Sequence, residues 1–589
     1  MIRFLHWLRS IMAAVLNGIA KFAFLLLLIL AVLVVIGLVR GDGTPANTVL
    51  TLDLRQGLPD SANGPRLPLS ARPLTVMDLL FTLDAASRGS RVKGVLVRVG
   101  GADLSIAQAE EIAAAFHRFR SSGKFVIARA TAFFGAGMGD YLTAAAADQI
   151  WVQPKGDFGV AGAGAGEIFL RGLFDKIHAE PQIAKRATYK SAADMYMEKT
   201  MTAPDREQLT AVMQSWYDAA VTAAATDRHL GKAAVAAAFE ASPQFSEDAR
   251  QKGLIDRLGY DDDALGAALG RAGAGAKPLK LRDYAGTDES AGTPNIAVIE
   301  AAGDIVDGTA GGSVLSTGAG IASDDLSEAI REAAREPGIK AIVLRVDSPG
   351  GSVTASDQIL DAVKKAQAKG KPVVVSMATY AASGGYYISA SANKIVAEPG
   401  TLTGSIGVLT GKVSVGKSLD MIGVGFDEVS VGKNTLMDSS LSPYTPDQWA
   451  ALNHEADVIY DDFLHKVAAG RKLPLAQVQQ VAGGRVWTGA DAKAHGLVDE
   501  LGGFWTAAGL AARLGGVVPD QLVFKVYPRR RGLLDGLANL MGTTGVSMKA
   551  LETLQTLAEL PGIAGVLGAA REVPRGGVEM RAVGLPQNK

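Results

Sequence analysis

Residues 339–352 read IKAIVLRVDSPGGS, an apolar run that ends in a turn with two adjacent glycines. Residues 92–105 read VKGVLVRVGGADLS and repeat this pattern in the first half of the chain. Apolar runs rich in β-branched residues that lead into a glycine-bearing turn are typical of buried strands. The sequence therefore contains the same strand-and-turn unit twice.

The similarity between the two halves continues beyond these strands. Residues 123–154, which begin GKFVIARA, match residues 370–399, which begin GKPVVVSM, and KGLIDRLG at 252–259 matches HGLVDELG at 495–502. Matched blocks in the same order indicate an internal duplication. In both copies, short apolar runs alternate with Ala-rich helical stretches, which predicts an α/β fold with parallel strands and crossover helices.

The duplication divides the chain into five predicted regions. They are an N-terminal anchor at 1–45, a first repeat at 46–270, a linker rich in Gly, Ala and charged residues at 271–293, a second repeat at 294–525, and a C-terminal extension of unassigned role at 526–589.

The N-terminal anchor is predicted from an unbroken apolar stretch. Residues 22–39 read FAFLLLLILAVLVVIGLV and would span about 27 Å as a helix, close to the thickness of the bilayer core. No A-x-A-like cleavage pattern follows, so we expect an uncleaved transmembrane segment. Because Arg3, Arg9 and Lys21 precede it, we expect the N-terminus to be cytoplasmic.

Composition excludes several classes of function. The chain has 59 basic and 60 acidic side chains, so it has no excess of positive charge that would attract a polyanion. We therefore expect no nucleic-acid partner. It has no cysteine, which excludes disulfides, thiol catalysis and cysteine-ligated metals. Nothing in the sequence indicates a metal or a cofactor.

Three motifs of the second repeat carry candidate catalytic groups. The glycines of DSPGGS, 347–352, allow backbone N–H groups to approach a ligand closely. In AASGGYY, 381–387, small neighbours leave the Ser383 hydroxyl accessible at the start of a predicted helix, with the Gly384 N–H directed outward. A second hydroxyl, from Ser405, lies in TGSIGV, 403–408.

The first repeat lacks these groups. Asp103 and Leu104 stand at the positions of the two glycines, Met138 at that of Ser383 and Val160 at that of Ser405. We therefore expect the nucleophile to lie in the second repeat.

A base for this serine is predicted from the first repeat. His454, His465 and His495 lie in no recognisable catalytic pattern, whereas Lys190 lies in RATYKSAADMY, a weakly charged segment. A buried lysine can lose its charge and act as a general base, which would activate a serine without histidine. Lys433, within the second repeat, is an alternative base.

Together, the anchor, the duplication, YKSA, DSPGGS, ASGGYY and TGSIGV resemble the long, duplicated form of the signal peptide peptidase A family, also called protease IV. The resemblance implies tandem ClpP/crotonase-like domains in a homotetramer, anchored by one helix in the bacterial inner membrane with the catalytic domains in the periplasm. It implies a serine endopeptidase with signal peptides and other hydrophobic peptides as substrates.

The resemblance also assigns residue roles. It makes Ser383 the nucleophile, Lys190 the general base and Ser405 the residue that orients the lysine amine. Gly350 and Gly384 would form the oxyanion hole, with Gly351 as an alternative to Gly350. No family counterpart is assigned to residues beyond Tyr527.

Two other functions are compatible with parts of the pattern. A crotonase-like acyl-CoA enzyme would use the same backbone N–H groups. This function needs a carboxylate base and a CoA site, and for it we would expect a soluble chain. A non-catalytic membrane scaffold would use the duplicated domains for assembly alone. The predicted anchor argues against the first, and Ser383 together with Lys190 favours the peptidase over both.

Overall fold

We describe the protein from a computed structural model. It describes residues 21, 44–61, 73–101, 104–134, 137–284, 292–309, 320–518, 521–527 and 579–581. The predicted transmembrane segment 22–39 lies outside these residues. Among the helices that are described, none has both the length and the apolar character needed to cross a bilayer.

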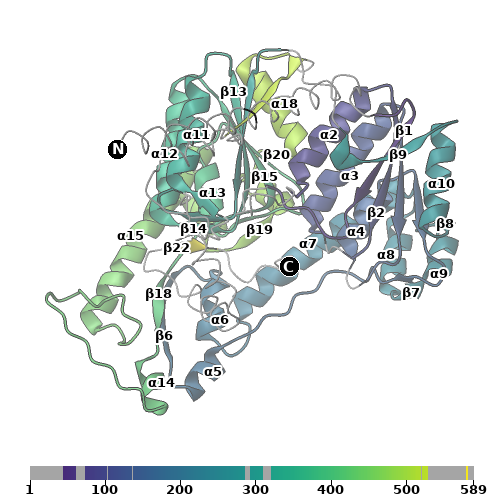
Figure 1. The fold of residues 1–589 in the computed structure, drawn as a ribbon. Coiled ribbons are helices and arrows are strands. Elements are labelled where there is room, and N and C mark those ends of the chain that lie inside the picture. Colours follow the sequence, from purple (N-terminus) through teal and green to yellow (C-terminus); the bar gives the residue numbers. More distant parts are fainter. Residues whose placement is uncertain are drawn as a thin grey trace, which may run out of the picture.

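The first repeat forms a six-stranded parallel sheet in the order β8-β4-β3-β2-β1-β9 (Figure 1). Its strands are β1 (Thr48–Asp53), β2 (Val92–Val99), β3 (Phe125–Ala130), β4 (Gln149–Val152), β8 (Arg257–Leu258) and β9 (Lys277–Lys280). Strand β9 lies within the range 271–293 that composition suggested as a linker. It pairs with β1, so this part of the range completes the edge of the first sheet.

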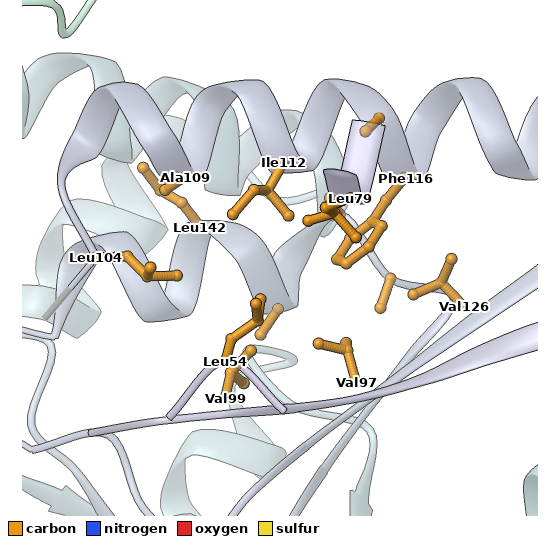
Figure 2. Close-up of a cluster of buried hydrophobic side chains, with 14 of the residues drawn as sticks. Leu54, Leu79, Val97, Val99, Leu104, Ala109, Ile112, Phe116, Val126 and Leu142 are labelled. Carbon is orange, nitrogen blue, oxygen red and sulfur yellow. The ribbon is translucent and has the colours of Figure 1, made fainter. Parts of the chain in front are cut away.

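The helices of the first repeat connect and cover these strands. They are α2 (Val76–Arg88), α3 (Ile106–Ser121), α4 (Met138–Ala145), α7 (Ala203–Asp227), α8 (Lys232–Glu240), α9 (Ser246–Gln251) and α10 (Asp261–Ala272). Helix α2 begins at a capping box, in which Thr75 and Asp78 exchange side-chain and backbone hydrogen bonds. Figure 2 shows Leu79 of α2 and Ile112 and Phe116 of α3 directed into one buried apolar cluster.

The second repeat builds the same order again, β20-β16-β15-β13-β10-β21, with β17 and β19 added beside β15. Its strands are β10 (Ile296–Ala302), β13 (Ala341–Ser348), β15 (Val373–Ala382), β16 (Lys394–Ala397), β17 (Leu402–Gly404), β19 (Val486–Thr488), β20 (Glu500–Leu501) and β21 (Phe524–Tyr527). The matching strand orders confirm the α/β class and the duplication that the sequence predicted.

Both faces of the second sheet are buried, which explains why its strands are continuously apolar. On β13, Val343 belongs to the cluster shared with the first repeat, whereas its neighbours Ile342 and Leu344 belong to a second cluster. Helix α18 (Phe504–Gly515) packs in the shared cluster, and α11 (Ser323–Arg335) and α12 (Val353–Ala368) pack in the other. The shared cluster is therefore an apolar core that joins the two repeats.

A third sheet mixes strands from both repeats, in the order β12-β11-β14-β22-β18-β6. Its strands are β6 (Glu180–Arg186), β11 (Asp304–Val306), β12 (Gly320–Ala322), β14 (Gly350–Ser352), β18 (Val408–Ser414) and β22 (Glu579–Arg581). Figure 1 shows β6 beside β18, away from the other strands of its own repeat. Strand β6 thus carries a segment of the first repeat into the second.

The remaining described helices and strands belong to none of these three sheets. They are α5 (Arg171–Lys176), η1 (Ser191–Ala193), α6 (Asp194–Met197), α13 (Gly384–Ser389), α14 (Gly416–Met421), α15 (Pro446–Arg471), α16 (Leu475–Val481), α17 (Gly489–Ala494), η2 (Leu281–Asp283), and the paired β5 (Asp157–Phe158) and β7 (Gln244–Phe245).

A buried ion cluster connects the repeats at their core. Arg345 of β13 is fully buried, and its guanidinium donates to the carboxylates of Asp60 and Glu111 in the first repeat. It also donates to the Ser376 hydroxyl at 3.0 Å, so each of its five N–H groups has a partner. Glu111 in turn accepts the N–H of Phe504 at the start of α18 at 2.7 Å.

Replacing Arg345 should destabilise the protein strongly. Arg345→Met leaves two buried carboxylates without their cation, and we expect the free energy of unfolding in urea to fall by about 3–5 kcal/mol. Arg331→Met, which removes an exposed pair with Glu328, should change it by less than about 1 kcal/mol. Equal effects of the two variants would contradict the view that the cluster holds the repeats together.

Candidate active site

Lys190 reaches the second repeat because β6 pairs with β18. The two strands form an antiparallel ladder that runs from Val408 opposite Arg186 to Ser414 opposite Glu180. Lys190 follows β6 closely, immediately before η1. The N–H of Tyr189 donates to the carbonyl of Gly483 at 2.9 Å, which ties this segment to the second repeat.

Ser383 lies in a sharp turn between β15 and α13. Its backbone has φ +56° and ψ −115°, a conformation that is costly for a residue with a side chain. Its N–H donates to the carbonyl of Gly404 at 2.8 Å, which helps to hold the turn. A Cβ on Gly385 would lie 2.5 Å from the carbonyl oxygen of Ser348, so this position requires glycine.

The structure brings Lys190, Ser383 and Ser405 together within one chain. The Lys190 Nζ lies 2.8 Å from the Ser383 Oγ, 3.0 Å from the Ser405 Oγ and 3.1 Å from the Ser405 carbonyl oxygen. All three side chains are buried, and Lys190 is only 1% exposed. The residues are far apart in the sequence, so this cluster exists only in the folded chain.

Burial lowers the pKa of Lys190 to about 7. Its amino group makes hydrogen bonds to hydroxyl and carbonyl oxygens, and none of its partners among the described residues is a carboxylate that would stabilise a positive charge. Desolvation disfavours the charged form of an amine, so a substantial fraction of Lys190 is neutral near pH 7. A neutral amine in contact with a serine hydroxyl can accept its proton.

The position of Lys190 also depends on Gly484, a residue that sequence reasoning missed. Gly484 has φ +74°, and a Cβ there would lie 2.6 Å from the backbone nitrogen of Lys190. Its N–H donates to the carbonyl of Ile406 at 2.8 Å, next to Ser405. The only signal in the sequence is the pair of glycines in AGGRV, 482–486. Such a pair, taken by itself, indicates an ordinary turn.

The glycines of DSPGGS lie beside the N-terminus of α13. The N–H of Gly350 donates to the Ser348 Oγ at 3.2 Å. The backbone nitrogen of Gly351 lies 3.1 Å from the position that a Cβ on Gly384 would occupy. Gly351 and Gly384 thus have backbone groups close together next to Ser383.

The other predicted candidates lie elsewhere. Lys433 is largely exposed and pairs with Asp447 at 2.6 Å. Met138 and Val160, the counterparts of Ser383 and Ser405, are buried in the apolar core of the first repeat. Among the described contacts of Ser383, no histidine occurs.

Comparison with known proteins agrees with the duplication. The profile of peptidase family S49 matches residues 118–274 and 365–517, and the Clp protease profile matches residues 323–399. These ranges lie in both repeats and contain the segments that carry Lys190 and Ser383.

Named relatives match over most of the chain. A chloroplastic serine protease SPPA of Arabidopsis thaliana is 30% identical over 81% of this chain and 70% of its own length. Protease 4 of Haemophilus influenzae is 30% identical over 77% of this chain and 74% of its own length. Protease 4 of Salmonella typhi is 32% identical over 68% of this chain and 66% of its own length. The chain therefore belongs to peptidase family S49 and is a serine protease.

Proposed function

We propose that Ser383 and Lys190 form the catalytic dyad of a membrane-bound endopeptidase that degrades cleaved signal peptides and other hydrophobic peptides. The observation that carries the proposal is the 2.8 Å separation between the Lys190 Nζ and the Ser383 Oγ in a buried site. This distance lies within the range that proton transfer from a nucleophile to a base requires.

The hydrogen bonds of Lys190 favour proton transfer in this direction. A neutral amine has two protons and one lone pair. The two oxygens of Ser405 can accept both protons, at 3.0 and 3.1 Å, which leaves the lone pair for the Ser383 hydroxyl. Ser405 would therefore orient the base without taking part in bond formation.

The proposed reaction follows from these positions. The Ser383 Oγ attacks the scissile carbonyl carbon while its proton passes to the Lys190 Nζ. Collapse of the tetrahedral intermediate breaks the C–N bond, and Lys190 returns the proton to the departing amine. Water then attacks the serine ester while Lys190 accepts its proton. The C–O bond to the Ser383 Oγ breaks, and Lys190 returns the proton to that oxygen, which restores the free serine and the neutral amine.

Two backbone N–H groups would stabilise the oxyanion of each intermediate. The sequence suggested Gly350 with Gly384 and left Gly351 as an alternative. Because the N–H of Gly350 already donates to Ser348, and the nitrogen of Gly351 lies next to Gly384, we propose Gly351 with Gly384. Donors of this kind lower the barrier most where they face the developing charge.

The substrate class, the membrane location and the tetramer rest on the family resemblance. The tetramer has further support from exposed apolar residues between α14 and α15. Ile422 is 74% exposed, Val429 is 90% exposed and Val431 is 93% exposed. These residues are close in the sequence, and exposed apolar groups that gather on one surface commonly mark interaction surfaces, so we propose that neighbouring subunits cover them. The catalytic domains would lie in the periplasm and the N-terminus in the cytoplasm.

Removing either member of the dyad should abolish peptide hydrolysis. Ser383→Ala removes the nucleophile and Lys190→Ala removes the base, and we expect both to lower kcat/KM at least about a thousandfold. Lys433→Ala, which replaces an exposed lysine in the repeat that carries Ser383, should change kcat/KM less than about tenfold. Labelling with a fluorophosphonate should disappear in Ser383→Ala. Persistent labelling there would show that another residue is the nucleophile.

Mixing the two inactive variants should not restore activity. In this structure both residues come from one chain, so each subunit of a mixed oligomer would lack one member of the dyad. Subunit exchange can be followed with differently tagged chains. Recovery of activity on exchange would show instead that the dyad forms between subunits.

The pH dependence of hydrolysis should report the titration of Lys190. Below its pKa of about 7 the amine is charged and cannot accept a proton, so kcat/KM should rise with pH through about 7 and then level off. The profile can be measured with a short chromogenic peptide whose own groups do not titrate in this range. A rise with a midpoint near 10 would mean that burial does not lower the pKa of the base.

Gly484 offers a test of the geometry without changing a catalytic group. In Gly484→Ala the new Cβ would collide with the backbone of Lys190, so we expect kcat/KM to fall at least about tenfold. Gly483→Ala is a matched control, because Gly483 has φ +61° but its Cβ would meet nothing closer than 3.6 Å. The control should lose stability and retain activity. Equal loss of activity in both variants would exclude a specific effect on Lys190.

A further inference from the structure

A buried amide side chain ties the segment that carries Lys190 to the second repeat. Gln208 lies near the start of α7 and is only 3% exposed. Its Nε2 donates to the carbonyl oxygen of Tyr189 at 3.2 Å and to the Ser191 Oγ at 2.9 Å. These two residues flank Lys190 in the chain, so the amide fixes the backbone from which the base extends.

The other end of the amide contacts a strand of the second repeat. The N–H of Val486, the first residue of β19, donates to the Gln208 Oε1 at 3.2 Å. Strand β19 pairs with β17, and in this ladder Val486 lies opposite Gly404. The carbonyl of Gly404 accepts the N–H of Ser383, and Ser405 follows Gly404 directly. One side chain thus links the lysine segment to the strand next to both serines.

Helix α7 can present this amide because it packs against the second repeat along several of its turns. Figure 1 shows α7 extending from the sheet of the first repeat to β19. The Ser215 Oγ lies 3.0 Å from the Thr488 Oγ1 of β19. The Trp216 Nε1 donates to the carbonyl of Gly400 at 2.9 Å. These contacts hold the helix against β19 independently of Gln208.

We propose that Gln208 is a positioning residue for the reaction, which holds the Lys190 amine against its two serine partners and keeps it out of water. This inference rests on the proposed function, because it takes Lys190 as the base. Gln208 is buried, so it acts through the lysine segment and not by touching substrate. An amide suits this role because it offers N–H donors and a carbonyl acceptor on one rigid group. A carboxylate lacks the donors, and an apolar side chain lacks both.

Loss of the amide would affect the base in two ways. The N–H of Val486 and the carbonyl of Tyr189 would lose this partner, which favours entry of water between the two segments. Hydration stabilises the charged form of an amine, so the pKa of Lys190 would rise from about 7 toward the ordinary value for lysine. The separation of the Lys190 Nζ and the Ser383 Oγ would also vary more. Both effects lower kcat.

Other titratable groups surround the lysine segment, and their contribution to a pH profile has to be separated. The groups described there are Asp194 with Lys185, Glu207 with Arg485, and Asp205 with Glu167. Burial and the neighbouring Asp205 raise the pKa of Glu167 to about 8, so its titration lies close to that of Lys190. Glu167→Gln removes this titration and should leave the midpoint of the profile near 7.

The test compares two buried glutamines in the full-length protein, with a short chromogenic peptide as substrate. Gln208→Met removes the hydrogen bonds and keeps an unbranched side chain of similar length. We expect kcat at pH 7 to fall at least about tenfold, KM to stay within about threefold of wild type, and the midpoint of the pH profile to rise by about 1 pH unit.

Gln244→Met is the matched control. Gln244 is also buried, and its Nε2 donates to the carbonyl of Ala238 at 2.9 Å, within the first repeat. This variant should lose stability in urea but keep the kcat, KM and pH midpoint of the wild type. Equal changes of kcat and midpoint in Gln244→Met and Gln208→Met would overturn the inference, because a general loss of stability would then explain both.

Ser191→Ala is a milder second variant, which removes one acceptor of the amide and leaves Gln208 in place. It should lower kcat about threefold and raise the pH midpoint in the same direction, and it decides the question alone if Gln208→Met does not fold. A wild-type kcat and midpoint in the folded variants, or a midpoint that moves as far in Glu167→Gln, would overturn the inference. Hydrolysis that persists in Lys190→Ala would instead refute the proposed base, so the two failures can be told apart.

Discussion

The antiparallel pairing of β6 with β18 is the interaction on which the site depends. It joins a segment that lies between β4 and β8 of the first repeat's sheet in the chain to the strand that follows Ser405. This backbone ladder delivers Lys190 to a place that its own repeat could not reach. Once there, the amine is enclosed by two serines and by glycines that leave no room for other side chains. The same enclosure removes water and lowers the pKa of the lysine.

The buried ion cluster around Arg345 has a complementary role. Burying a cation with two carboxylates costs desolvation free energy, and removing any one of the partners leaves an uncompensated buried charge. The cluster therefore favours arrangements in which all three groups meet. Asp60 and Glu111 come from the first repeat and Arg345 from the second, so the cluster is complete only in one arrangement of the two repeats. That arrangement is also the one in which β6 meets β18.

Duplication gave the chain two copies of one sheet, and their sites have diverged. The second copy keeps the serine turn and the glycine loop, whereas the first has Met138 and Val160 at the corresponding positions, buried in its core. A hydroxyl at such a core position would need a hydrogen-bond partner, while an apolar side chain needs only space. The first copy can therefore serve as a packing partner and as the source of the lysine.

The sequence by itself determined the duplication, the α/β class and the candidates Ser383, Lys190 and Ser405, because strand periodicity and differences between aligned copies are local properties of the chain. Only the tertiary structure decided that Lys190, and not Lys433, meets Ser383, and that Gly484 and Arg345 hold the parts in place. These contacts join residues of the two repeats, 193 positions apart for Lys190 and Ser383, and no local pattern records them. The tertiary structure also decides the pKa of Lys190, because the lysine is buried only after both repeats have packed.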